Sequence, residues 1–124
     1  MYRKETKTSR KPKVILGTHD SVVTDICYDS DYADNDAFRV NYHITTDDGE
    51  TFDYSEIFYN NEQNERTKAF WDYLEANGIN VDNMEAFNGC RERVTIKKRI
   101  DRYNVARPSI VYREFVAHPE EVQS

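Results

Sequence analysis

Basic side chains occupy four of the five alternate positions from 91 to 99 of this 124-residue chain. Alternate residues of a β-strand point to the same face, so one face of a strand here carries Arg91, Arg93, Thr95, Lys97 and Arg99, and the other carries Val94, Ile96 and Ile100. Cations that follow phosphates, with aromatic rings on which bases stack, are what a single nucleic-acid strand requires. The pattern therefore favours nucleic-acid contact.

Other polar and aromatic residues extend this row. A loop after the basic strand adds two arginines and a tyrosine, and the outer face of an alternating strand at 38–45 adds three polar groups. The complete predicted nucleic-acid site is Arg39, Asn41, His43, Tyr59, Arg91, Arg93, Lys97, Arg99, Arg102, Tyr103 and Arg107. The alternative is that the basic strand is a sheet edge whose Lys and Arg prevent pairing with another sheet.

A block of carboxylates suggests a second kind of partner. Residues 14–65 carry thirteen acids and one base, whereas residues 91–113 carry eight bases and two acids. The acidic block could occupy the basic channel of a host nucleic-acid-binding protein by charge complementarity, as DNA-mimicking inhibitors of host defence such as anti-CRISPR proteins do. The residues that would do so are Asp29, Asp31, Asp34, Asp36, Asp47, Asp48, Glu50 and Asp53. An ordinary solvated acidic face is the third account of this block.

Residues suited to catalysis do not form a recognisable pattern. The three histidines lie in different segments and none forms a metal-binding pair, the four glycines are too dispersed for a phosphate loop, and the aspartates at 29–36 lack the Gly and Glu of a calcium loop. We expect no enzyme activity, metal or cofactor. Cys27 and Cys90 are expected to be buried thiols without a disulfide.

The composition predicts a mostly β fold. Val, Ile, Thr, Tyr, Phe and Trp number 43, against 11 Leu, Ala and Met. Richness in β-branched residues predicts one long bent strand at 14–28, and alternation of period two predicts strands at 38–45 and 91–100. Further strands are predicted at 51–59, directly after Asp47-Asp48-Gly49 as a tight turn, and at 109–116. Helical spacing predicts one main helix at 66–77, stopped by Gly78, and a short turn follows with Asp82 as its cap. The predicted core is Phe38, Val40, Tyr42, Ile44, Phe70, Leu74, Val94 and Ile96.

These elements form one predicted domain at 14–117, between a flexible basic arm at 1–13 and a frayed tail at 118–124. No window approaches 18 consecutive apolar residues and no apolar stretch follows the basic N-terminus, so we expect neither a membrane span nor a secretory signal. The expected location is the cytoplasm. The sequence leaves the oligomeric state open.

The order of three strands, a helix and two strands resembles the OB-fold, a five-stranded Greek-key barrel. In detail the chain is similar to short single-stranded-DNA-binding-like proteins of phages and mobile elements of Gram-positive bacteria. The similar segments are AFRVNYHITTDDGETFDYSEIFYN, FWDYLEANGINVDNMEAFNGCRERVTIKK and SIVYREF, with Leu74, Gly78, Ile79, Phe87 and Gly89 at matching positions. The resemblance implies an OB-like barrel that binds single-stranded DNA, or RNA, in a phage or mobile-element context.

Overall fold

The structure, a computed structural model, describes residues 14–28, 37–60, 63–101 and 103–119. The predicted element order is confirmed within these ranges. The elements are β2 (Gly17–Tyr28), β3 (Ala37–Thr45), β4 (Thr51–Tyr59), α1 (Glu65–Ala76), the 3₁₀-helix η2 (Val81–Phe87), β5 (Arg91–Ile100) and β6 (Ala106–Ala117). The predicted arm at 1–13 and the acidic loop at 29–36 lie outside the described residues.

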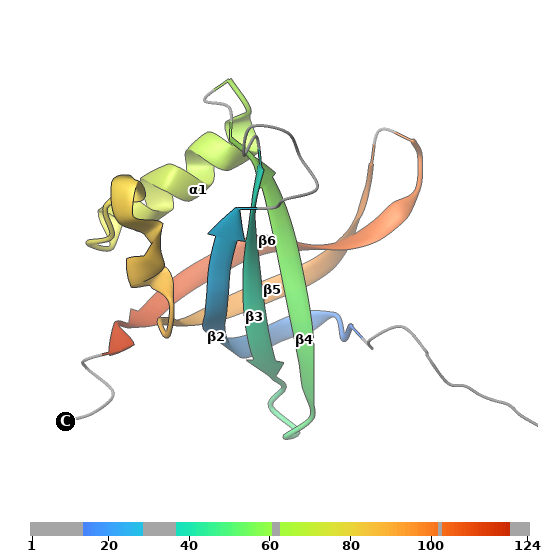
Figure 1. The fold of residues 1–124 in the computed structure, drawn as a ribbon. Coiled ribbons are helices and arrows are strands. Elements are labelled where there is room, and N and C mark those ends of the chain that lie inside the picture. Colours follow the sequence, from blue (N-terminus) through green and yellow to red (C-terminus); the bar gives the residue numbers. More distant parts are fainter. Residues whose placement is uncertain (1–13, 29–36, 61–62, 102, 120–124) are drawn as a thin grey trace, which may run out of the picture.

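All five strands belong to one antiparallel sheet in the order β4-β3-β2-β5-β6 (Figure 1). The central strand β2 pairs with β5 over Gly17 to Val22 and with β3 over Asp20 to Tyr28, with an irregularity between Val23 and Asp25. An irregularity of this kind bends a strand and increases its twist. The sheet is accordingly strongly bent, and β5 and β6 cross behind β2, β3 and β4 in Figure 1.

The two outermost strands, β4 and β6, are not joined by a backbone ladder within the described residues. Side chains connect them instead. The hydroxyl of Tyr54 on β4, for example, donates to the carbonyl oxygen of Pro108 on β6 at 3.1 Å. The sheet is therefore not closed, and the predicted barrel is not confirmed.

The position of β5 corrects two interpretations of the basic strand. Residues Arg91 to Ile96 lie between β2 and β6, so this part of the strand is not a sheet edge. The remainder, from Lys97 to Ile100, extends beyond β2 and pairs only with β6. Ile100, predicted to share the strand face of Val94 and Ile96, is 65% exposed because it lies in this extension.

The core lies between the concave face of the sheet and α1, and every predicted core residue is buried. Asn64 caps α1 by accepting a hydrogen bond from the amide of Thr67 at 3.1 Å. Gly78 ends the helix region with a φ of +83°, as its predicted role requires. For η2, however, the cap is Asn80 and not Asp82, because the Asn80 side chain accepts from the Asp82 amide at 2.8 Å.

The predicted burial of the cysteines is confirmed for Cys90 and is wrong for Cys27. Cys27 pairs with Arg39 near the end of β2, where its side chain is exposed.

Beyond β6, His118 stands at the start of the predicted tail. The centroids of its ring and of the Phe115 ring lie 4.8 Å apart, so the chain still packs on the domain at this position.

Candidate nucleic-acid interface

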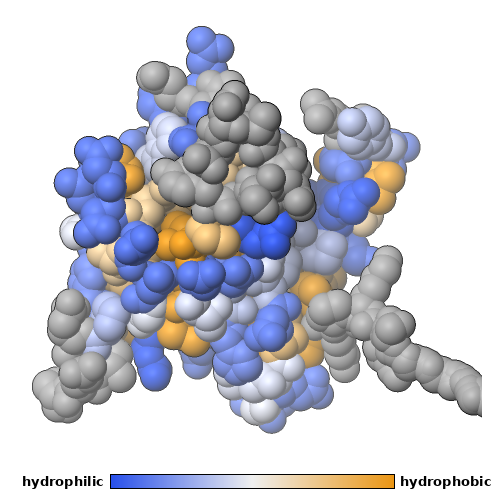
Figure 2. Space-filling model, viewed as in Figure 1, coloured by the Kyte–Doolittle hydropathy of each residue, from blue (hydrophilic) through white to orange (hydrophobic). Residues whose placement is uncertain are grey.

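The end of the β5–β6 hairpin projects from the sheet (Figure 1). Lys97, Lys98 and Arg99 are exposed in this extension, and their side chains make no hydrogen bond or ion pair with any other described residue. Figure 2 shows hydrophobic atoms beside hydrophilic ones at this hairpin, where Ile100 and Val105 are exposed. The hairpin thus presents unpaired cations next to apolar surface.

Asp101 organises the turn of this hairpin. Its Oδ1 accepts from the amides of Tyr103 at 2.8 Å and Val105 at 3.0 Å, and its Oδ2 accepts from Nε of Arg107 at 2.7 Å. The hydrogen bond from Val105, followed by that from Arg107, lowers the pKa of Asp101. Arg107 is therefore partly neutralised, whereas Tyr103 is 72% exposed. Arg102 lies outside the described residues.

Two predicted cations lie at the other end of β5. Nη1 of Arg93 lies 2.8 Å from Oδ1 of Asp20, and its two terminal nitrogens each lie 3.2 Å from an oxygen of Asp47. The hydrogen bond with Arg93 lowers the pKa of Asp47. Arg93 is thus paired with two carboxylates of the folded chain. Arg91 is exposed and is not ion-paired with any residue that the structure describes.

Arg39, Asn41 and His43 alternate on the outer face of β3, as predicted, but they do not continue the hairpin's surface. Asn41 accepts from the hydroxyl of Ser55 at 2.6 Å, and Nδ1 of His43 lies 2.9 Å from Oδ1 of Asp53. Arg39 and Asn41 lie opposite Cys27 and Asp25 of β2, beyond the end of the β2–β5 ladder at Val22, and Lys97 and Arg99 lie past its other end at Gly17. Tyr59 lies at the end of β4 and is 45% exposed.

The alternative acidic surface is only partly described. Asp29, Asp31, Asp34 and Asp36 lie outside the described residues. Of the others, Asp47 contacts Arg93 and Asp53 contacts His43. Asp48 and Glu50 lie in the turn between β3 and β4. Of the four described carboxylates, Asp47 is therefore paired with an arginine and Asp53 is hydrogen-bonded to a histidine.

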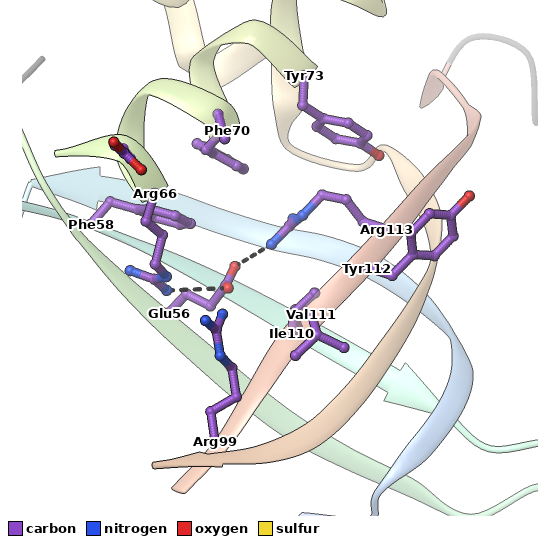
Figure 3. A pocket seen from close by; sticks show the side chains of 12 residues that line it. Glu56, Phe58, Arg66, Phe70, Tyr73, Arg99, Ile110, Val111, Tyr112 and Arg113 are labelled. Atoms are coloured by element: carbon purple, nitrogen blue, oxygen red, sulfur yellow. Dashed lines mark hydrogen bonds and ion pairs between the residues drawn. The ribbon is translucent and has the colours of Figure 1, made fainter. Parts of the chain in front are cut away.

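Sequence reasoning missed a pocket of about 600 Å³ at the opening between β4 and β6 (Figure 3). Arg99 enters it from β5, Arg66 from α1 and Arg113 from β6. Tyr112 also lines it and is 63% exposed. Apolar and acidic groups complete the lining: Glu56, Phe58, Glu65, Ala69, Phe70, Tyr73, Ile110 and Val111.

Beside this pocket lies a buried ionic cluster that sequence reasoning also missed. Glu56 accepts from the hydroxyl of Tyr42 at 2.5 Å and from Nη2 of Arg113 at 2.7 Å. Glu92 accepts from the hydroxyl of Tyr73 at 2.7 Å and from Nη1 of Arg113 at 3.3 Å. A signal was present, because Glu92 shares the alternation of Val94 and Ile96 and is thereby placed on the inner face.

Burial controls the ionisation of this cluster. It raises the pKa of Glu92, an effect that the positive charge of Arg113 only partly offsets, and Oε1 of Glu92 has no hydrogen-bond partner within the described chain. Burial also raises the pKa of Tyr42, and that of Tyr54 to about 12. These phenols stay protonated and serve as hydrogen-bond donors at physiological pH.

Within the described ranges, no group of three or more His, Cys, Asp or Glu side chains is arranged to hold a metal ion. None of the helices there has the length and apolar character needed to cross a membrane. A comparison with models of known protein families found no match. A comparison with curated protein sequences found none either.

Proposed function

We propose that this protein binds single-stranded nucleic acid, without catalysis or a cofactor, through the β5–β6 hairpin and the adjoining pocket. One observation carries the proposal: Lys97, Lys98 and Arg99 are exposed together without a partner among the described residues, close in sequence to the exposed ring of Tyr103. Unpaired cations can replace the counterions of phosphates, which drives binding. Exposed rings can stack on bases of any sequence.

The net charge of −6 does not oppose this proposal, because the charges are segregated. Residues 97–107 carry five bases and one acid, and that acid, Asp101, is turned toward its own loop amides and Arg107. A phosphate chain approaching the hairpin therefore meets a locally positive field, which acts over roughly one Debye length of about 8 Å at physiological salt.

The fold is compatible with an OB-like barrel that is left open between β4 and β6. The chain order is three strands, a helix and two strands, and the sheet order places the third and fifth of these strands at its two edges. The OB-fold is itself a partly open five-stranded barrel that binds oligonucleotides. The phage or mobile-element context is part of the same proposal and is supported by the sequence resemblance alone.

The proposal is tested by titrating labelled oligo-dT at about 50 mM and 200 mM salt. We expect salt-sensitive binding that is weakened in Lys97→Glu, with a salt slope smaller by about 0.7 for each lost phosphate contact. Lys68→Glu is the matched control, because Lys68 is an exposed lysine on α1 outside the pocket lining. Absence of binding by the natural protein at low salt would refute the proposal. An equal loss of affinity in Lys97→Glu and Lys68→Glu would show that net charge, and not the hairpin, governs binding.

A further inference from the structure

Two stacked rings and a guanidinium lie together at the wall of the pocket between β4 and β6 (Figure 3). The rings of Phe58 and Phe70 are stacked with their centroids 4.4 Å apart and an interplanar angle of 16°. Cζ of Arg66 lies 4.2 Å from the centroid of Phe58. Figure 3 shows Phe70 and the end of the Arg66 side chain on opposite sides of the Phe58 ring.

The guanidinium of Arg66 is held in place before any ligand arrives. Its Nη1 donates to the carbonyl oxygen of Ile57 at 2.9 Å and its Nη2 to Oε2 of Glu56 at 3.3 Å. Glu56 is fixed in turn by Tyr42 and Arg113. The Arg66 side chain is nevertheless 43% exposed and lines the pocket, so the guanidinium is held against Phe58 while part of the side chain stays open to the pocket.

We propose that the pocket binds a single nucleobase, stacked on the guanidinium of Arg66 where it opens to the pocket, with the adjacent phosphate at Arg99. Bases stack on arginine planes as they do on aromatic rings. Arg99 lines the same pocket and is not paired with any described residue. This inference rests on the proposed function and adds to it a defined site for one base.

The lining fits one base and one phosphate better than a cluster of phosphates. Of the three arginines, Arg66 and Arg113 are each paired with Glu56, which leaves Arg99 as the unpaired cation of the described lining. Glu65 adds a further negative charge. The negative charges of Glu56 and Glu65 would repel a ligand with several phosphates. A neutral base beside one phosphate needs only a flat group on which to stack and a single cation, and the pocket supplies both. The volume of about 600 Å³ lies within the usual range of small-molecule sites.

The test places 2-aminopurine at single positions of oligo-dT and measures its fluorescence together with affinity. The natural protein should quench the probe at one or a few positions, because stacking quenches it. Arg66→Lys keeps the positive charge but replaces the planar guanidinium with an ammonium group, on which a base cannot stack. It should lower affinity roughly 5- to 150-fold, abolish the quenching and leave the salt slope unchanged. Arg99→Gln should instead reduce the salt slope by about 0.7, and Lys68→Gln should change neither quantity.

Each outcome decides between the site and the function. Binding of oligo-dT with unchanged affinity and quenching in Arg66→Lys would overturn the base site and leave the hairpin proposal standing. No binding by the natural protein would overturn both. If thermal melting shows that Arg66→Lys does not fold, the side-chain Nε–H resonance of Arg66 in the natural protein decides. That signal should shift when oligo-dT is added, and its constancy would overturn the base site.

Discussion

Nη2 of Arg113 lies 2.7 Å from Oε1 of Glu56, and this ion pair joins β6 to β4, the two outermost strands of the sheet. The Arg113 side chain is 13% exposed and that of Glu56 2%. Arg113 also reaches Glu92 on β5 at 3.3 Å. Because no backbone ladder joins β4 to β6 within the described chain, these side-chain contacts help to set the curl of the sheet and the shape of the pocket.

Replacement of Arg113 by Met should destabilise the protein strongly. The change leaves two buried carboxylates without their shared cation, and loss of one partner of a buried pair costs about 3 to 5 kcal/mol. Urea denaturation measures the change in the free energy of unfolding. Arg91→Met is the control, since Arg91 is exposed on β5 and surface changes of this kind stay within about 0.5 kcal/mol. Similar small losses in both variants would contradict the stabilising role of the cluster.

Glu92 should make stability depend on pH in a defined direction. Burial raises its folded-state pKa above the usual 4.5, so above pH 4.5 the folded state retains a proton that the unfolded state loses. The stability contributed by this group is complete below that value and is lost as pH rises through the raised pKa. The difference in unfolding free energy between the natural protein and Glu92→Gln should therefore fall with pH, by at most about 1.4 kcal/mol per unit. If the unfolding free energies of the two proteins change in parallel from pH 4 to pH 8, the raised pKa of Glu92 is contradicted.

Asp101 should control the order of the hairpin turn without controlling the whole fold. Asp101→Ala removes the acceptor of the Tyr103 and Val105 amides, and it frees Arg107. We expect faster hydrogen exchange at these two amides, while amides of the core strand β3 keep their protection. Unchanged exchange at Tyr103 and Val105 would show that the backbone alone holds the turn.

Tyr112 should act as a stacking ring that sequence reasoning did not identify. It is 63% exposed, pairs with Thr95 across the strands and lines the pocket with Arg99. Tyr112→Ser should weaken binding of oligo-dT by roughly 5- to 150-fold, the range for loss of one base–aromatic stack. Tyr112→Phe keeps the ring and should bind like the natural protein. A loss of equal size in the Phe variant would point to the hydroxyl instead of the ring.

The sequence by itself determined the local features of this protein. Alternation at 38–45 correctly placed Val40 and Tyr42 inside and Asn41 outside, because a strand's two-residue period is a property of the backbone alone. The main helix was predicted within one residue at either end, since its apolar spacing and the glycine after it are local signals. The basic strand and its exposed hairpin cations were visible in the same way.

Only the tertiary structure decided which charged side chains are paired within the chain and which are left without a partner among the described residues. Arg93 is committed to Asp20 and Asp47, which lie 73 and 46 positions away, and Arg113 meets Glu56 at a separation of 57. Such partners are set by the order of strands and the curl of the sheet, which place distant segments side by side. No local period encodes that arrangement. The pocket, its arginine platform and the division between paired and unpaired cations therefore became visible only once β4 and β6 were brought together.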